Sequence, residues 1–265
     1  ADRPSRTGRL NARQRRRGDT LIEGILLAFL FLALLLLFLL SLKVRASRAG
    51  SLRLLPGMEE LPGLVARSAE TGQPLHVSVG VGGVGGPTTA ETWAGLTLFG
   101  QLADEAVARG ASLVVTVADA TVLPIAQDIL QRAYDRYGFP EGYDPDQVRF
   151  VAPQPTAYAM GVMGVLERES LAGNVMVGSF GDEYLLIGET GARQGVHQIV
   201  GTTNPQTLPL VYASADETLI GEEVFATGAY TSRLPMQIAS LLTEDWLRWL
   251  LIAAIVVTAI CKLAT

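Results

Sequence analysis

The chain has 265 residues, 49% of them hydrophobic and 18% charged, and its formal net charge is −5. The charge is divided unevenly, because residues 1–53 carry a net charge of +8 while residues 59–245 hold 23 acids against eight arginines. A region this acidic repels phosphate backbones, so we expect no binding of nucleic acid. That region also lacks lysine and cysteine, which excludes Schiff-base catalysis, a thiol nucleophile and cysteine-bound metal from it.

An arginine-rich tail, residues 1–20, opens the chain and is followed by an apolar run over residues 21–42. The run is long enough for one membrane-spanning helix, which needs about 20 mostly apolar residues. Lys43 and Arg45 follow it where a signal peptide would have a cleavage site, which indicates an uncleaved anchor. The tail either sets the topology of this anchor or contacts anionic lipid headgroups. Residues 43–63 contain Leu-Pro-Gly twice and predict a linker.

Residues 64–242 alternate short apolar runs with longer amphipathic ones, which predicts a Rossmann-like α/β fold with a mostly parallel, doubly wound sheet. A capping box of Thr88 and Glu91 marks the start of one long helix. Residues 183–201 are mixed and rich in glycine. The predicted strands are 76–81, 112–118, 148–151, 174–177 and 208–213, and the predicted helices are 64–71, 88–109, 122–137, 156–169 and 218–230.

Two short motifs of the α/β region recur in its second half. Val77–Gly80 is similar to Val175–Gly178, and Ala118–Thr121 is similar to Ala215–Thr218. The two offsets are nearly equal, as expected if two halves derive from one βαβ unit. The alternative is a chance match between short runs of common residues.

A second apolar run covers residues 249–261 and predicts a second membrane-spanning helix over residues 243–263. Trp246 and Trp249 lie near its start, where tryptophan anchors a helix at the level of the lipid headgroups. Two spans place both termini on one side of the membrane and the α/β region on the other side. Basic residues flank the first span at both ends, so the side that the α/β region faces stays open.

Three stretches of the middle region, 67–76, 188–191 and 218–223, contain the sequences RSAETGQPLH, GETG and TLIGEE. They resemble a family of bacterial membrane-anchored proteins that is labelled only as a domain of unknown function. The resemblance extends from Leu54 to Asp245. It implies an anchored α/β domain and an integral location in a bacterial cell membrane, and it supplies no activity and no catalytic residue. The arginine-rich tail departs from the short N-termini of that family.

The sharpest motif is GVGGVG over residues 80–85, a G-x-G-x-x-G pattern between a predicted strand and a predicted helix. In a dinucleotide fold such glycines let the backbone approach the pyrophosphate. Gly80, Gly82 and Gly85, with Asp119 as the acidic partner, therefore form a candidate nucleotide site. Two details disagree, because Asp119 lies farther along the chain than the usual ~20 residues and a proline delays the helix. The alternative is a flexible turn or a flap against a neighbouring subunit.

Acidic residues and a histidine suggest further chemistry. Asp119 and Asp216 are expected at the carboxyl ends of two strands, where they form either a shared acidic pocket or two helix caps. Glu183, Glu189 and His197 are a candidate acid/base group. The other histidine of the chain lies far from His197 in the sequence, so the spacing predicts no metal site.

Small residues form two candidate interfaces. Ala157, Gly161 and Gly164 lie on one face of a predicted helix, and Gly24 and Ala28 lie on one face of the first predicted span. In the span, this spacing promotes the association of helices within a membrane. In the soluble helix, the alternative to an interface is close packing against the domain's own sheet.

Two functions follow from these patterns. The first is a membrane-anchored scaffold or assembly module, oligomeric or part of a membrane complex, without catalytic activity. It is favoured because the middle region has few cations, and no lysine or cysteine, with which to bind and transform an anionic substrate. The second is a membrane-tethered nucleotide-binding or hydrolytic domain that uses the loop at 80–85. The first function takes the lipid bilayer and further subunits as partners, and it requires neither a metal nor another cofactor.

Overall fold

The computed structural model describes residues 55–232 and, outside them, only isolated helical positions between residues 30 and 39 and between 243 and 255. The chain divides into two compact units, of which Leu52–Arg233 is the α/β domain. The predicted spans, 21–42 and 243–263, lie outside the described residues apart from those isolated positions. No helix of the described residues is long and apolar enough to cross a membrane.

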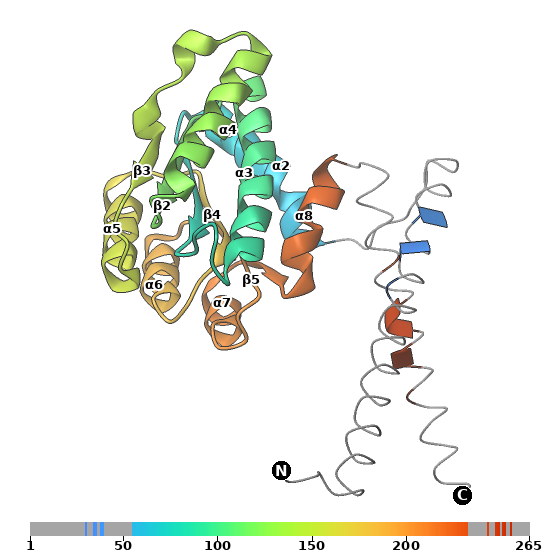
Figure 1. The fold of residues 1–265 in the computed structure, drawn as a ribbon. Coiled ribbons are helices and arrows are strands. Elements are labelled where there is room, and N and C mark those ends of the chain that lie inside the picture. Colours follow the sequence, from blue (N-terminus) through green and yellow to red (C-terminus); the bar gives the residue numbers. More distant parts are fainter. Residues whose placement is uncertain are drawn as a thin grey trace, which may run out of the picture. The chain divides into compact units, whose positions relative to one another are not determined.

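The domain is built on one sheet of six strands, all parallel, in the order β3-β2-β1-β4-β5-β6 (Figure 1). The order reverses between β1 and β4, which is the topological switch point of a doubly wound sheet. The predicted Rossmann-like architecture is therefore confirmed. The strands are β1 Leu75–Gly80, β2 Leu113–Val117, β3 Val148–Phe150, β4 Gly173–Ser179, β5 Gln198–Thr202 and β6 Glu217–Ile220.

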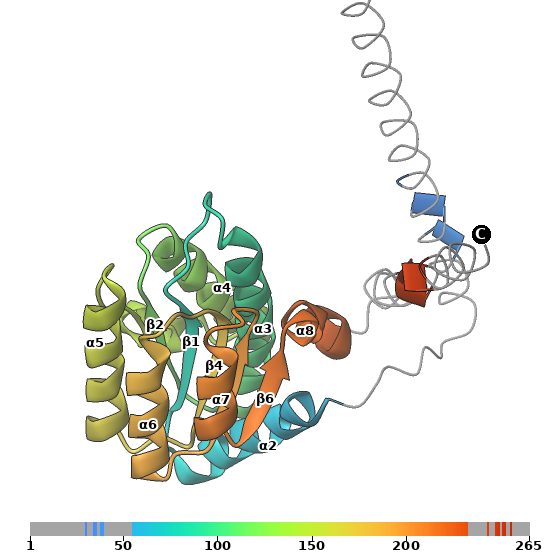
Figure 2. The same ribbon diagram turned by 90° about the horizontal axis from the view of Figure 1, so that it is seen from below.

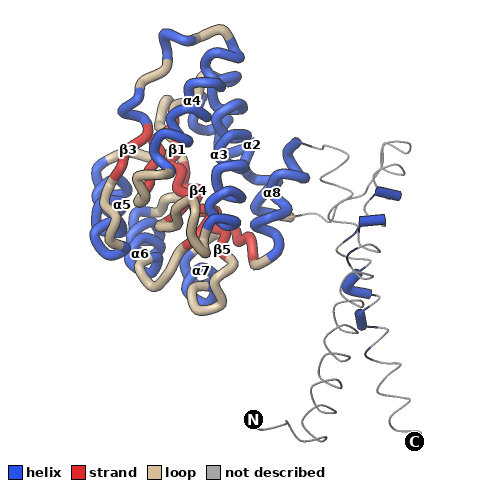
Figure 3. The backbone as a smooth tube through the Cα atoms, viewed as in Figure 1, coloured by secondary structure: helices blue, strands red, loops and turns tan. Residues whose placement is uncertain are grey.

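Helices cover both faces of the sheet (Figures 2 and 3). We call the larger group the α3 layer and the smaller group on the opposite face the α5 layer. Two short 3-10 turns, η1 (Pro140–Gly142) and η2 (Pro145–Gln147), lead into β3. The α3 layer consists of α2 Pro56–Thr71, α3 Thr89–Arg109, α4 Val122–Tyr137 and α8 Glu222–Ser232, and the α5 layer consists of α5 Pro155–Arg168, α6 Tyr184–Gln194 and α7 Leu208–Ser214.

Burial on both faces accounts for the apolar strands, and glycines account for the ends of four helices. The strands β1, β2, β4 and β5 are buried along their whole length, as expected for parallel strands covered on both faces. Four helices end where the chain turns into the left-handed region, which glycine adopts without steric cost. These C-terminal glycines are Gly72, Gly110, Gly138 and Gly195, which end α2, α3, α4 and α6.

Helix α3 lies unusually close to the sheet. A Cβ atom at Gly95 would be 2.1 Å from the carbonyl oxygen of Val177 in β4, so only glycine fits there. This close contact holds the amino end of α3 beside the carboxyl ends of β1 and β4 (Figure 1). The sequence therefore places one helix start directly at the switch point.

The structure corrects the start of the domain. The predicted linker over residues 43–63 and the helix predicted from Leu64 are wrong for residues 56–63, because α2 already begins at Pro56. Proline is well tolerated in the first turn of a helix, where its missing N–H has no intrahelical acceptor. Leu61, Leu64 and Val65 then form a buried face at helical spacing against the sheet.

The last third of the domain also differs from the prediction. Residues 208–213, predicted as a strand, form α7, and residues 218–230, predicted as one helix, form β6 and α8. The mixed stretch 183–201 forms α6 and β5. A short apolar run has no clear period, and here a proline in the first turn of α7 favours the helix.

The two sequence repeats have different outcomes. Val77 of β1 lies opposite Val175 of β4, so the first pair of motifs forms the two central strands of the sheet. Asp119 follows β2 at the carboxyl edge, whereas Asp216 precedes β6 at the amino edge. The second pair of motifs is therefore not structurally equivalent, because residues 208–213 form a helix and not the expected strand.

Candidate functional site

The glycine motif lies at the switch point. Gly80 is the last residue of β1, and the loop that follows it runs between the carboxyl ends of β1 and β4 to the start of α3. Gly80 has a φ of 83°, and a Cβ atom there would lie 2.0 Å from the carbonyl oxygen of Ser179. Open α/β sheets bind their ligands at this position, so the loop has the location that the sequence predicted.

The loop packs tightly against its own domain. A Cβ atom at Gly82 would lie 2.5 Å from Thr92 Oγ1 and 2.9 Å from Ser179 Cβ. A Cβ atom at Gly83 would lie 2.5 Å from a carboxylate oxygen of Asp119. Both glycines therefore allow the backbone to approach side chains of the same chain, where a dinucleotide fold would place a pyrophosphate.

Asp119 is a turn residue next to this loop. Its Oδ1 accepts a hydrogen bond of 2.7 Å from the backbone N–H of Thr121, immediately before α4. The hydroxyl of Thr121 in turn accepts a hydrogen bond of 3.1 Å from the N–H of Val84. The half-exposed carboxylate thus fixes the β2–α4 turn and brings a negative charge to the glycine loop.

The carboxyl edge of the sheet is acidic. Within residues 55–232, the loops that follow the six strands contain no lysine or arginine. By contrast, Arg109, Arg136, Arg168 and Arg193 lie in the last turns of α3, α4, α5 and α6. Those helices run antiparallel to the strands, so these cations lie toward the amino edge. A phosphate at the switch point would face acids, among them Glu91, Asp119, Asp182 and Glu183.

The predicted capping box is wrong. Helix α3 begins at Thr89, and the side chain of Thr88 makes no capping hydrogen bond. The hydroxyl of Thr89 accepts a hydrogen bond of 2.9 Å from the N–H of Gly85 and so ties the loop to the helix. The carboxylate of Glu91 accepts a hydrogen bond from Thr203, after β5, and does not reach back to the helix start.

The candidate acid/base residues are not brought together. Glu183 lies at the carboxyl edge, where it accepts a 2.7 Å hydrogen bond from the N–H of Gly181. Glu189 lies on α6 and pairs with Arg193 at 2.5 Å. His197 lies at the amino edge, immediately before β5. The prediction of one group is therefore wrong, because α6 separates its first member from its last.

Asp216 also lies apart from Asp119, so the prediction of a shared acidic pocket is wrong. Asp216 Oδ2 accepts a 2.8 Å hydrogen bond from the backbone N–H of Gln198 and lies 3.5 Å from His197 Nδ1. The other ring nitrogen of His197 is 2.7 Å from a carboxylate oxygen of Glu60 on α2. These contacts connect α2 to the starts of β5 and β6 at the amino edge of the sheet, whereas the glycine loop lies at the carboxyl edge.

Sequence reasoning missed a row of fully buried polar side chains beneath the α5 layer. Burial lowers the pKa of His76 to about 4, so its ring is neutral at neutral pH. Burial likewise raises the pKa of Tyr158 to about 12. The signal in the sequence was polar residues at alternate positions of apolar strands. The members are His76, Ser78, Thr116, Tyr158, Asn174 and Gln198.

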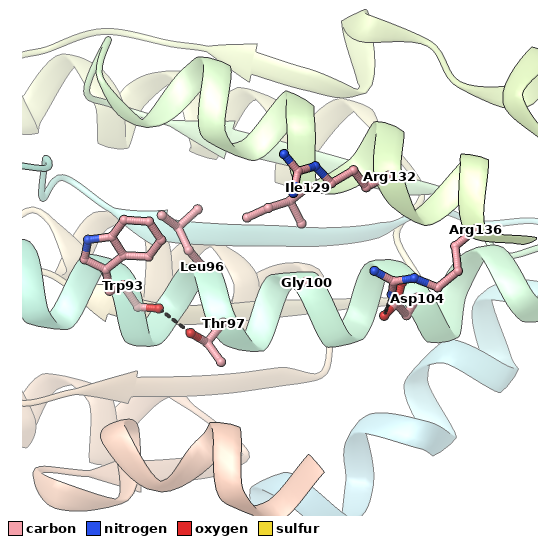
Figure 4. A pocket seen from close by; sticks show the side chains of 8 residues that line it. All are labelled: Trp93, Leu96, Thr97, Gly100, Asp104, Ile129, Arg132 and Arg136. Carbon is pink, nitrogen blue, oxygen red and sulfur yellow. Dashed lines mark hydrogen bonds and ion pairs between the residues drawn. The ribbon is translucent and has the colours of Figure 1, made fainter. Parts of the chain in front are cut away.

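A shallow groove of about 280 Å³ lies between α3 and α4 (Figure 4). Trp93 lies at one end of it, and Asp104 and Arg136 lie at the other. Its charges pair within the domain, since Arg136 binds Asp104 and Arg132 lies 2.9 Å from Asp128. The groove is slightly smaller than the usual ligand pocket of roughly 300–1,000 Å³. Both of its arginines already pair with acids of the same domain and are not free to bind a ligand.

The predicted interface residues have different environments. Ala157 is exposed on α5, and Gly161 and Gly164 are half-buried. A Cβ atom at Gly161 would lie 2.1 Å from Val151 Cγ1, so this glycine serves packing within the domain. The predicted contacts of Gly24 and Ala28 lie outside the described residues.

The outer face of the α5 layer is apolar and poor in charge. Its three helices contain two acids and two arginines, whereas the helices of the α3 layer contain ten acids and four arginines. Four large apolar side chains are exposed on it: Met160, Leu185, Leu186 and Tyr212, with exposed fractions of 65%, 47%, 38% and 76%.

Within the part of the chain that the structure describes, no three or more histidine, cysteine or acidic side chains are placed to hold a metal ion. Residues 19–265 match a protein family described as Domain of unknown function (DUF6754). No curated protein and no solved structure matches the chain. Because the family match covers nearly the whole sequence, the chain belongs to the DUF6754 family.

Proposed function

We propose that the protein is a membrane-anchored assembly module, which associates with further copies of itself through the outer face of the α5 layer and catalyses no reaction. The observation that carries this proposal is a neutral, apolar helix layer on a strongly acidic domain. The described residues 55–232 contain 21 acids and seven arginines, so two copies repel each other over most of their surface. Contact between copies is least opposed where charge is absent.

The α5 layer meets this requirement. Two of its four charged residues, Glu189 and Arg193, neutralise each other in an ion pair on α6. Met160 and Tyr212 project from it with 65% and 76% of their surfaces exposed. Large exposed apolar side chains mark surfaces that bind other proteins, and the centre of such interfaces is depleted in charge.

A second copy of the same face is the partner that fits this surface. On α5 the projecting Met160 lies near the exposed Ala157, while Val151 and Arg168 of the same domain occupy the space beside Gly161 and Gly164. A two-fold axis across α5 would place the methionines of the two copies, each with its Ala157, against each other, because a two-fold interface pairs a patch with itself. A partner with a strongly charged surface would gain nothing from a neutral face.

The membrane anchor is part of the same proposal. Its support is the apolar length of residues 21–42 and of the run 249–261, together with Trp246 and Trp249 near the start of the second predicted span, 243–263. Two spans from one chain confine the domain to a layer beside a bacterial cell membrane. Confinement raises the effective concentration of neighbouring domains, so a modest contact area is sufficient for assembly.

The test compares three forms of the full chain in mild detergent and in nanodiscs by light scattering. We expect the wild type to form a discrete oligomer and the double variant Met160→Glu, Leu185→Glu to be monomeric. The control Phe225→Glu changes a 50% exposed side chain of the α3 layer and should leave the oligomer intact. A monomeric wild type in both media, or a control as disruptive as the double variant, overturns the proposal.

The second candidate is a tethered nucleotide-binding or hydrolytic domain that uses Gly80, Gly82, Gly85 and Asp119. Its support is the position of the loop at the switch point, ahead of the amino end of α3. Against it stand the tight packing of the loop and the acidic carboxyl edge. Equilibrium binding of labelled NAD and ATP to the full chain separates the two functions. Saturable binding that is lost in a folded Gly82→Ala variant favours the second candidate.

A further inference from the structure

The six buried polar side chains form one continuous line of hydrogen bonds across β5, β4, β1 and β2. The line begins at two backbone carbonyls, one in α6 and one at the end of α7, and ends at the backbone N–H of Gly80, where the glycine loop starts. Between these two ends, each contact joins two side chains from different elements. The direction in which every proton points can be worked out from one fixed end.

That fixed end is Gln198. Its Nε2 lies 3.0 Å from the carbonyl oxygen of Gly188 and 2.9 Å from that of Ser214. A carbonyl oxygen only accepts, so this atom is the nitrogen of the amide and donates both hydrogen bonds. The Oε1 of Gln198 then accepts from Asn174 Nδ2 at 3.0 Å.

The orientation of Asn174 fixes the proton on His76. With Nδ2 donating to Gln198, the oxygen Oδ1 of Asn174 faces His76 Nδ1 at 2.7 Å. An amide oxygen only accepts, so Nδ1 carries the proton. Because the buried ring is neutral, Nε2 has no proton and accepts from the hydroxyl of Thr116 at 2.9 Å.

The remaining hydroxyls have no freedom left. Thr116 has used its single proton on His76, so the contact of 2.9 Å between Thr116 Oγ1 and Tyr158 Oη requires Tyr158 to donate. The carbonyl oxygen of Thr116, at 3.4 Å, is a longer second acceptor for the same proton, so in either case Tyr158 donates to Thr116. Tyr158 has then used its proton, so Ser78 donates to it at 2.5 Å. Ser78 Oγ accepts from the N–H of Gly80 at 3.0 Å. Every donor along the line therefore points the same way, and each link has one proton.

We propose that this one-way chain is a conformational device that positions the glycine loop: it ties the N–H of Gly80 through Ser78 and Tyr158 to α5 and the central strands, so that the loop and the α5 layer move as one unit. Hydrogen bonds in a buried chain strengthen one another, and a break leaves two groups unsatisfied. Tyr158 is the only member of the chain on a helix. The coupling does not depend on self-association of the domain.

The two buried tyrosines of the α5 layer provide a matched pair of variants for the test. Tyr158→Phe removes one oxygen atom and separates Thr116 from Ser78. Tyr184→Phe removes the same atom from the other buried tyrosine of the α5 layer. The hydroxyl of Tyr184 bonds Ser214 Oγ at 2.8 Å and is not part of the one-way line of hydrogen bonds. Both changes keep the aromatic ring, so the two variants differ in the connection to the loop.

Hydrogen exchange of the full chain in detergent, followed by mass spectrometry, measures the effect. We expect amides of residues 80–85 to exchange at least threefold faster in Tyr158→Phe and at the wild-type rate in Tyr184→Phe. Ser78→Ala, which removes the acceptor of the Gly80 N–H, should reproduce the first result even if Tyr158→Phe does not fold. Equal exchange of the loop in both tyrosine variants and in Ser78→Ala would overturn the proposal.

The proton on His76 gives an independent test. Nitrogen NMR of histidine-labelled protein, with His197→Gln to leave one ring in view, reports which ring nitrogen carries hydrogen. The one-way chain requires hydrogen on Nδ1 in the wild type and in Tyr184→Phe. Hydrogen on Nε2 contradicts the direction of the chain and hence the proposal.

Discussion

The two faces of the sheet differ in both their inner and outer surroundings. Beneath the α3 layer, β1 and β2 present only aliphatic side chains, among them Leu75, Val77, Leu113 and Val115. On the opposite face, the same strands present three of the six members of the buried hydrogen-bond chain, His76, Ser78 and Thr116. On the outer surfaces the distribution of polarity is reversed: the α3 layer carries most of the charged side chains, and the α5 layer is apolar.

This difference separates two ways of stabilising one sheet. Beneath the α3 layer, burial of apolar area is sufficient, and any side chain of similar shape should be tolerated. Beneath the α5 layer, stability also depends on hydrogen-bond partners that must all be present. The first face should be sensitive to volume, and the second to the removal of single polar atoms.

The largest effect should come from volume in the α3 layer. Gly95→Val adds a side chain where a Cβ atom already meets the carbonyl oxygen of Val177 at 2.1 Å, so α3 must move away from β4. We expect a loss of at least about 4 kcal/mol in the free energy of unfolding, or no folded protein. Gly63→Ala, in open space on α2, should change it by less than about 1 kcal/mol. Similar thermal unfolding of the two variants would contradict the close contact.

The next effect concerns the buried chain. Asn174→Leu keeps the volume but leaves His76 Nδ1 and Gln198 Oε1 without their partners, at about 3 kcal/mol in total. The matched change under the α3 layer, Leu96→Met, should cost less than about 1.5 kcal/mol. Denaturation of the full chain in detergent measures both. An equal cost would show that the two faces do not differ in kind.

The fold was largely predictable from the sequence, whereas the buried chain was not. The alternation of short apolar runs with longer amphipathic ones predicted a doubly wound sheet. The short run 208–213, which forms most of α7, was predicted as a strand because it has no clear period, and this error also misplaced Asp216. His76 and Asn174 are far apart in the sequence, and only the pairing of β1 with β4 brings them opposite each other.

A pH dependence sharpens the comparison further. Burial lowers the pKa of His76 from 6.5 to about 4, and the nearby charges of Glu169 and Arg149 act in opposite directions and pair with each other. Between those two pH values the unfolded state binds the proton and the folded state does not. Stability therefore falls as the pH falls from 6.5 to about 4, by about 3 kcal/mol in all.

The comparison that isolates this effect uses His76→Gln. This variant should start less stable and lose less stability than the wild type over the same pH range, because it has no ring to protonate. The measurement is the midpoint of thermal unfolding at several pH values. Parallel curves for the two proteins would show that the protonation of His76 does not limit stability in acid.

The smallest effects on stability are expected on the outer face of the α5 layer, where we propose that substitutions decide assembly. The most direct test is cross-linking in native membranes, with Cys261→Ser as background so that one introduced cysteine reports each position. A Met160→Cys chain should form a disulfide-linked dimer, and a Trp93→Cys chain, which reports the α3–α4 groove, should stay monomeric. Cross-linking through Trp93→Cys but not through Met160→Cys would contradict assembly through the α5 layer.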